Sequence, residues 1–248
     1  MGATEYMLLI VVGLVGGFLN TVAGGASLLT LPVLIFLGIP PTQANATNNV
    51  ATTAQSLLAA IRHAERGYTD WWLVARLSLP AVLGGAVGAL IVVSMTDAVF
   101  RQVIAVVMVG ALLVVARPRV SPGVGGGLGK FSLAAGLLGV ALLAVYGGFF
   151  GGGVGLLLLP LIAGLFGRDL LTANGVKCAL TFAMNVTAAG VFLWNDMIHW
   201  LPAGVLTAAM LVGAWIGVDA AIERGEAWIR RVLVVVTLSA AGWLALGP

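Results

Sequence analysis

Long apolar runs, separated by short polar connections, make up almost the whole chain. The runs cover residues 5–37, 42–61, 71–93, 98–116, 131–166, 170–194, 200–221 and 227–246. Because a bilayer core about 30 Å thick takes roughly 20 apolar residues of α-helix, each run is long enough for a crossing. Strands of a transmembrane barrel would instead show short segments of alternating polarity. The pattern predicts an all-α integral membrane protein with about 8–10 membrane segments.

Two of these runs are too long for one crossing. Residues 5–37 would span about 50 Å as a single helix. The segments NTVAGGAS (20–27) and GGFFGGGVG (147–155) each offer a break, because glycine lowers helix propensity by about 1 kcal/mol per residue. Unwound backbone at membrane depth is tolerated only inside protein or beside a watery cavity. We therefore expect 5–37 and 131–166 each to form a broken or re-entrant helix pair, with the break at a protected centre.

The chain also matches itself. Residues 44 to about 107 resemble those 129 positions later, which indicates a duplication. The informative matches are Asn45 with Asn174, Thr52 with Thr181, Trp71 with Trp200, and Arg101 with Arg230. We expect repeat 1 at 1–116 and repeat 2 at 131–248, each with a broken pair followed by three transmembrane helices. The linker RPRVSPGVGGGLGK (117–130) between them is rich in Pro and Gly, which break helices.

The basic residues predict the orientation of the repeats, since short cytoplasmic loops collect Lys and Arg. If each opening run is a broken pair, the repeats are inverted and all basic residues of the loops except Arg101 fall on one side. These are Arg62, Arg66, Arg117, Arg119, Lys130, Arg168, Arg224, Arg230 and Arg231. Single crossings would instead make the repeats parallel and divide these residues evenly. We therefore predict inverted repeats with both termini outside the cytoplasm. The first run has no positive n-region, so we expect it to remain in the protein rather than be cleaved as a signal peptide.

A polar stripe runs along segment 170–194. Asn174, Lys177, Thr181 and Asn185 are spaced i, i+3, i+7 and i+11, which places them on one helical face. The matching positions in repeat 1 are Asn45, Asn48, Thr52 and Ser56, beside Asn49. A lysine in a membrane helix costs about 2.5 to 3.5 kcal/mol on insertion scales, so it marks a site or a pathway. The alternative is that Lys177 reaches the interface with its long side chain, which does not explain why the stripe continues inward.

The two breaks complete the candidate site. Half-helices that start near Ala26 or Ser27 and near Val154 or Gly155 would point their positive N-terminal ends inward, as broken transporter helices do. The glycines beside them either bring backbone close to a ligand or serve only close helix packing. Two positive helix ends, neutral donors and one ammonium together predict a site for a small anion. The candidate substrate-binding residues are Lys177, Asn174, Thr181, Asn185, Asn45, Asn48, Asn49, Thr52, Ser27, Gly24, Gly25, Gly152 and Gly153.

Composition narrows the class of protein. The 248 residues are 60% apolar and 8% charged, whereas soluble domains are about one-quarter charged. No Ser/His pair, paired acids or metal-ligand cluster is visible at membrane depth, so we expect no enzyme, no cofactor and no metal site. The expected partners are a small anion and the lipid bilayer, not nucleic acid. A homodimer is compatible with the sequence.

Two stretches carry a resemblance to a known family. GFLNTVAGGASLLTLPVLIFLGIPPTQANATNNVA (17–51) and GGFFGGGVGLLLLPLIAGLFGRDLLTANGVK (147–177) resemble the TauE/SafE, or sulfite exporter, family of bacterial membrane permeases. The resemblance implies transport of small sulfur-containing anions, such as sulfite, sulfoacetate or sulfolactate, across the bacterial inner membrane. We therefore expect a secondary transporter with a midplane site between the repeats and alternating access. The alternatives are an anion channel or facilitator, and a transporter of another small anion.

Overall fold

The computed structural model describes residues 2–22, 24–116 and 130–246, and these residues form helices without strands. The helices are α1 (Ala3–Val22), α2 (Ser27–Phe36), α3 (Pro41–Glu65), α4 (Trp71–Val93), α5 (Asp97–Ala116), α6 (Lys130–Phe149), α7 (Val154–Phe166), α8 (Leu170–Trp194) and α9 (Trp200–Leu246). Gly225, with φ 70°, divides α9 in two, so this part of the chain has ten helices. Residues 117–129 of the predicted linker lie outside the described residues.

Both opening runs are broken where the glycines predict. The helix α1 ends at Val22 and α2 begins at Ser27, while α6 ends at Phe149 and α7 begins at Val154. Four glycines in these breaks have positive φ, namely Gly24 (89°), Gly25 (105°), Gly151 (73°) and Gly153 (79°). A left-handed conformation costs other residues roughly 1–2 kcal/mol each. Glycine therefore makes these two interruptions possible at little conformational cost.

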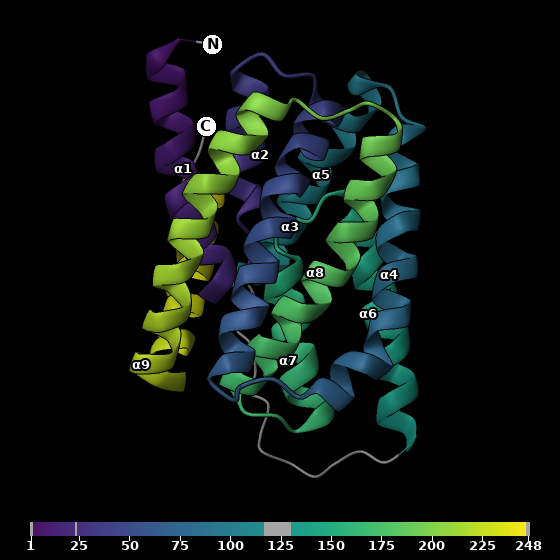
Figure 1. Cartoon of the computed structure of the whole chain (residues 1–248), viewed down its shortest axis with the longest axis vertical. Coiled ribbons are helices and arrows are strands. Elements are labelled where there is room, and N and C mark those ends of the chain that lie inside the picture. Colours follow the sequence, from purple (N-terminus) through teal and green to yellow (C-terminus); the bar gives the residue numbers. More distant parts are fainter. Residues whose placement is uncertain (1, 23, 117–129, 247–248) are drawn as a thin grey trace.

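The two broken pairs enter the molecule from opposite ends. The start of α1 and the α2–α3 connection lie at the upper end of Figure 1, whereas the start of α6 and the α7–α8 connection lie at the lower end. Helices α3 and α8 pack against each other between the pairs. The most extensive remaining contacts join α1 to α9 and α4 to α6. Each broken helix is thus held by a long helix from the other half of the chain.

Matching glycines permit these contacts. An ideal Cβ on Gly84 of α4 would lie 2.6 Å from the Ala144 Cβ of α6. On Gly213 of α9, 129 positions later, it would lie 2.1 Å from the Leu14 carbonyl oxygen of α1. Small residues let helix backbones approach closely in lipid, where packing replaces the hydrophobic effect as the driving force. Glycines at matching positions therefore allow close helix packing in both halves of the chain.

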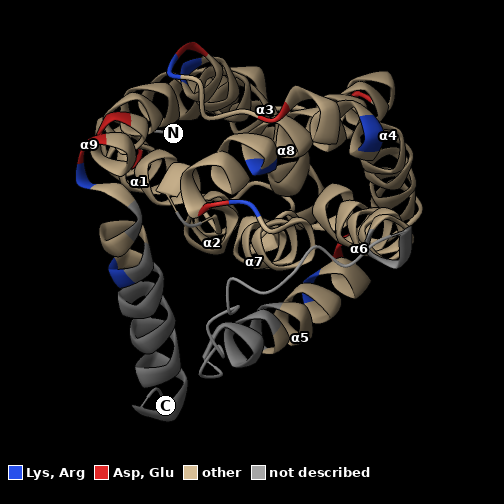
Figure 2. Ribbon diagram, turned by 90° about the horizontal axis from the view of Figure 1, so that it is seen from below, with Lys and Arg blue, Asp and Glu red and all other residues tan. Residues whose placement is uncertain are grey.

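Charged residues are confined mostly to the ends of the helices. Arg62 and Arg66 end α3, and Arg168 lies in the α7–α8 connection, all at the lower end of Figure 1. Figure 2, seen from that end, shows how few charged positions the helices carry. Within the described ranges, four helices are long and apolar enough to cross a membrane. They are Ala3–Val22, Trp71–Val93, Leu170–Trp194 and Trp200–Gly225.

Candidate functional site

The two breaks touch each other at the centre of the molecule. An ideal Cβ on Gly24 would lie 2.5 Å from the Gly155 Cα, and one on Gly25 would lie 3.7 Å from the Gly153 Cα. These distances leave no room for a side chain on Gly24. The backbone of the first break therefore lies directly on that of the second, and both breaks contribute to one site.

A small polar cavity, here called the central cavity, lies where the breaks meet α3 and α8. It is lined by Asn20, Ser27, Asn45, Asn48, Asn49, Thr52, Phe150, Gly151, Val154, Thr181 and Asn185. Ser27 and Val154 are the first residues of α2 and α7, so two positive helix ends meet there. The cavity volume of about 10 Å³ is close to the minimum that holds one water molecule. In this conformation it is too small for a sulfur oxyanion.

Asparagine amides form most of the polar wall. Asn45 donates from Nδ2 to the Phe149 carbonyl at 2.9 Å and so caps the end of α6. Asn48 donates from Nδ2 to the Ser27 hydroxyl at 2.9 Å. Each primary amide has two N–H donors, and each of these bonds uses one. The wall therefore presents neutral hydrogen-bond donors rather than charges.

Two residues of this network, Asn20 and Gln55, were not predicted. The Asn20 Oδ1 accepts from the Gly25 and Ala26 amides at 3.0 and 3.4 Å, which caps the start of α2. Asn20 also donates from Nδ2 to the Gln55 Oε1, and Gln55 donates to the Thr21 hydroxyl at 2.7 Å. For Asn20, the signal in the sequence is an asparagine within an apolar run, four residues before the first glycine of the break.

Lys177 lies inside the protein, with 2% of its surface exposed. Its ammonium donates to the carbonyl oxygens of Asn20 and Thr21, both at 3.1 Å. These carbonyls belong to the last turn of α1, which is the negative end of that helix. The long side chain therefore does not reach the membrane interface. Instead, it ties α8 to the break in the first half of the chain.

Lys177 lines a second cavity next to the first. This lysine cavity also has a volume of about 10 Å³ and is lined by Asn20, Gln55, Ser56, Gly155, Lys177, Cys178 and Thr181. Asn20 and Thr181 line both cavities. Lys177 is absent from the wall of the central cavity, so its charge acts on that cavity from a neighbouring position.

Two hydroxyl groups of the lysine cavity have no partner. The Ser56 Oγ and the Thr181 Oγ1 are buried and make no hydrogen bond within the described residues. An unpaired buried polar group costs about 1–3 kcal/mol. Such a cost at two lining positions is typical of a site prepared for a ligand or a water molecule.

The structure brings most of the predicted site residues together, but not all. Seven of the thirteen line the central cavity: Ser27, Asn45, Asn48, Asn49, Thr52, Thr181 and Asn185. Gly24, Gly25, Gly152 and Gly153 shape the breaks without lining either cavity. Asn174 also lines neither. Its Nδ2 lies 3.2 Å from the His63 Nε2, one helical turn from Lys177 toward the lower end.

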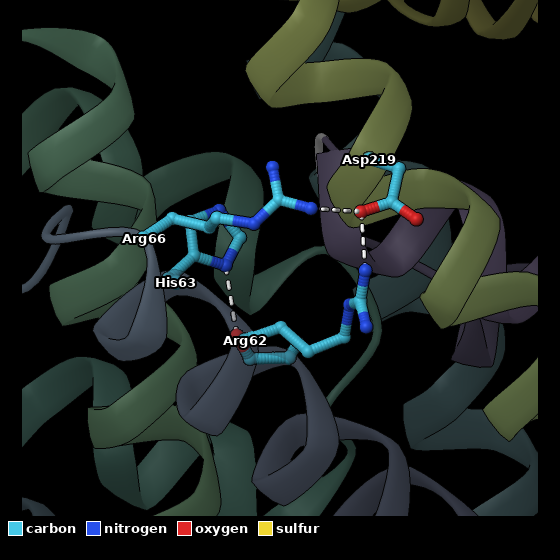
Figure 3. Close-up of polar contacts among 5 residues, drawn as sticks. Arg62, His63, Arg66 and Asp219 are labelled. Carbon is cyan, nitrogen blue, oxygen red and sulfur yellow. Dashed lines mark hydrogen bonds and ion pairs between the residues drawn. The ribbon is translucent and has the colours of Figure 1, made fainter.

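Ion pairs join the two halves at the lower end. Arg62, in the last turn of α3, and Arg66, directly after that helix, both pair with Asp219 of α9 (Figure 3). The Arg62 guanidinium also lies 3.7 Å above the ring of Trp215. A further pair joins Asp70, before α4, to Arg168, before α8. Each of these three pairs joins a residue before the linker to one after it, so they connect the two halves at this end.

Comparison with known proteins agrees with this architecture. The model of the family described as "Sulfite exporter TauE/SafE" matches residues 9–244. A "Probable membrane transporter protein ORF9" of Sinorhizobium sp is 28% identical over 97% of this chain and 92% of its own length. A "Probable membrane transporter protein" of Haemophilus influenzae is 28% identical, over 96% and 93% respectively. The "Probable membrane transporter protein YfcA" of Escherichia coli is 25% identical, over 91% and 84%.

No solved structure matches the chain. The family match covers nearly all of the sequence, including both breaks and both polar stripes. The resemblance of residues 17–51 and 147–177 is thereby confirmed. The chain is a multi-pass membrane protein and belongs to the TauE/SafE sulfite exporter family of membrane transporters.

Proposed function

We propose that the chain is a secondary transporter of small sulfur-containing anions, such as sulfite, sulfoacetate or a similar sulfonate. The family description supports the substrate class. The lining of the two cavities supports an anion, since it contains two helix N-termini, several amides and Lys177. No Asp or Glu is among the residues that line either cavity.

The observation that carries the proposal is the meeting of both breaks and both polar stripes around the central cavity. In secondary transporters, substrate sites lie near the midplane between inverted repeats, where interrupted helices meet. Two broken pairs that enter from opposite ends support two inverted repeats here. Because Arg62, Arg66 and Arg168 gather at the lower end, the positive-inside rule supports a cytoplasmic location of that end. Both termini then lie outside the cytoplasm.

The small volume of the central cavity favours alternating access over a channel. A central cavity that holds about one water molecule offers no continuous path for an anion. The ion pairs of Asp219 join the two halves at the lower end. Transport then requires the two halves to move relative to each other, opening the site to one side at a time. An anion channel is the alternative, and it would pass anions without saturation or stimulation by counter-substrate.

Flux in proteoliposomes tests the transporter. We expect saturable uptake of labelled sulfite or sulfoacetate that internal unlabelled anion accelerates. Lys177→Met keeps an apolar stem but removes the ammonium, so we expect uptake to fall at least about tenfold, as when a charge-assisted contact worth roughly 1.5–3 kcal/mol is lost. Arg76→Gln is the matched control, since this exposed arginine lies 3.5 Å above the Trp72 ring, away from both cavities. Unchanged uptake by Lys177→Met would remove Lys177 from the site.

Thermal stabilisation of the purified protein tests the substrate class. A ligand that binds only the folded protein raises the unfolding temperature in a concentration-dependent way. Sulfite, sulfoacetate, thiosulfate, sulfate and taurine span inorganic and organic sulfur compounds. We expect the strongest stabilisation by sulfite or a sulfonate. Stabilisation only by an anion without sulfur would favour the alternative of another small-anion transporter.

A further inference from the structure

His63 and Asn174 form a buried polar pair that the proposed function does not use. Both residues have 0% of their surface exposed. His63 lies near the end of α3 (Figure 3), and Asn174 lies near the start of α8, so the pair joins the two halves of the chain. A fully buried histidine either serves only the packing of the helices or binds and releases a proton.

The hydrogen bonds of the pair fix the resting state of the imidazole. The His63 Nδ1 lies 2.8 Å from the Ala59 carbonyl oxygen. Because a carbonyl can only accept, Nδ1 carries the hydrogen. In the neutral ring Nε2 is then an acceptor, and it receives a hydrogen bond from the Asn174 Nδ2 at 3.2 Å. The neutral histidine is thus fully paired.

The same pair can also hold the protonated ring. A proton added at Nε2 makes that atom a donor, which needs an acceptor in place of the Asn174 NH₂ group. The Asn174 Oδ1 is buried and makes no hydrogen bond within the described residues. A half-turn of the amide would bring this oxygen to Nε2. Asn174 therefore offers a partner for either protonation state.

The pair is enclosed on its lower side and lies close to the lysine cavity. An ideal Cβ on Gly175 would lie 1.9 Å from the Tyr68 carbonyl oxygen and 2.8 Å from the Thr69 Oγ1. The chain after α3 thus lies directly on the start of α8. On the other side, Asn174 is three residues from Lys177 on the same face of α8. A proton at His63 would be separated from bulk water in this closed state.

The surrounding charges link a proton at His63 to an anion. The charges of Lys177 on α8 and of Arg62 on its own helix act on the ring. Two further charged groups belong to the same cluster, Arg66 directly after α3 and Asp219 of α9. Both Arg62 and Arg66 pair with the Asp219 carboxylate (Figure 3). No described carboxylate forms a salt bridge with the ring. An anion in the adjacent cavities would offset the repulsion between an imidazolium and these cations.

We propose that His63 and Asn174 form a proton-binding site that couples anion transport to a proton gradient. The inference rests on the proposed function. Each anion then moves together with one proton, which binds at the His63 Nε2 and leaves when the lower end opens. This assigns the coupling ion, which the family and the relatives do not name.

Proteoliposomes with a controlled pH gradient test the coupling. Labelled sulfoacetate is the probe, with labelled sulfite measured in parallel, and valinomycin with equal potassium on both sides holds the membrane potential at zero. For the wild type, a gradient of one pH unit should drive accumulation toward about tenfold, since one unit is a tenfold ratio of proton activity. His63→Gln cannot bind the proton, so we expect no accumulation while counterflow stays within about twofold of wild type.

His199→Gln is the matched control. His199 is the other histidine of the chain and bonds to Gln43 at the upper end, so accumulation should be unchanged. If His63→Gln does not fold, Asn174→Ala tests the coupling instead, because this substitution removes the acceptor for the protonated ring. We expect it to lose accumulation and keep counterflow.

Three results would overturn the inference alone: a wild type that exchanges anions but ignores the pH gradient, a His63→Gln protein that still accumulates, or one that folds but loses counterflow as well. Absence of wild-type counterflow for both probes would overturn the proposed function, and the inference with it.

Discussion

Gly24, in the break between α1 and α2, lies against Gly155 at the start of α7, with its ideal Cβ position 2.5 Å from the Gly155 Cα. This contact joins the two interrupted helices through backbone alone. The two glycines therefore determine how closely the two breaks approach each other. The shape of the two cavities next to the breaks depends on this contact.

We expect Gly24→Ala to destabilise the protein more than Gly38→Ala. Both glycines have nearly the same positive φ, 89° and 88°, so each substitution costs roughly 1–2 kcal/mol in backbone conformation. Only Gly24 also faces a close contact, because nothing lies within 4 Å of the Cβ position of Gly38. Overpacking adds about 1–3 kcal/mol. Thermal unfolding in detergent measures both variants, and equal losses would contradict the contact.

Thr181→Val should stabilise the folded protein and weaken substrate binding. The Thr181 Oγ1 is buried without a partner in the described part of the chain, so its replacement by a methyl group recovers about 1 kcal/mol or more. The same hydroxyl lines both cavities, so the KM for anion uptake should rise. Thr207→Val is the control, since the Thr207 Oγ1 is also unpaired but lines neither cavity. A KM unchanged by Thr181→Val would exclude a direct role for this hydroxyl.

Asp219→Asn should open the lower end. It removes the carboxylate that pairs with Arg62 and Arg66 across the two halves. Cys178 is the single cysteine of the chain, is 2% exposed and lines the lysine cavity, so it reports this opening without further mutation. In inside-out vesicles, we expect an impermeant thiol reagent to label Cys178 several-fold faster in the variant.

Asp97→Asn provides the comparison for that experiment. The Asp97 carboxylate accepts from the amide and hydroxyl of Thr42, at 3.0 and 2.8 Å, near the upper end. We expect labelling from the lower side to stay at the wild-type rate. If Asp219→Asn also left the rate unchanged, the ion pairs would not hold this end closed.

Anion flux should not depend on sodium. In transporters with broken helices, carbonyls at the C-terminal end of a half-helix often coordinate a coupling Na⁺. Here the Lys177 ammonium occupies that position and bonds to the Asn20 and Thr21 carbonyls. Replacing external NaCl by choline chloride should therefore change initial uptake by less than about twofold, whereas a tenfold fall would show a sodium requirement.

The sequence predicts the breaks well because their cause is local. Glycine lowers helix propensity, and the ends of α1 and α6 fall inside the two predicted segments. The polar stripes are also local, since spacing alone places Thr181 and Asn185 on one face of α8. Both residues line the central cavity.

The depth of a residue in the membrane and its partner across the fold do not follow from the local sequence. Asn174 shares the face of Lys177 but lies only four residues after the start of α8, so it is below the cavities and bonds to His63. Periodicity gives the direction of a side chain around a helix, not its neighbour across the fold. The ammonium of Lys177 finds its carbonyl partners only when α8 packs near the end of α1. The amide of Asn20 finds Gln55 only when α3 packs there.

The lysine at position 177 has asparagine, Asn48, as its counterpart 129 residues earlier. An assembly of two copies of the second half would bring two ammonium groups to the centre, and two copies of the first half would bring none. Only a fused chain supplies one. A single chain with two different halves can therefore carry one positive charge in its core, which a symmetric pair of identical halves cannot.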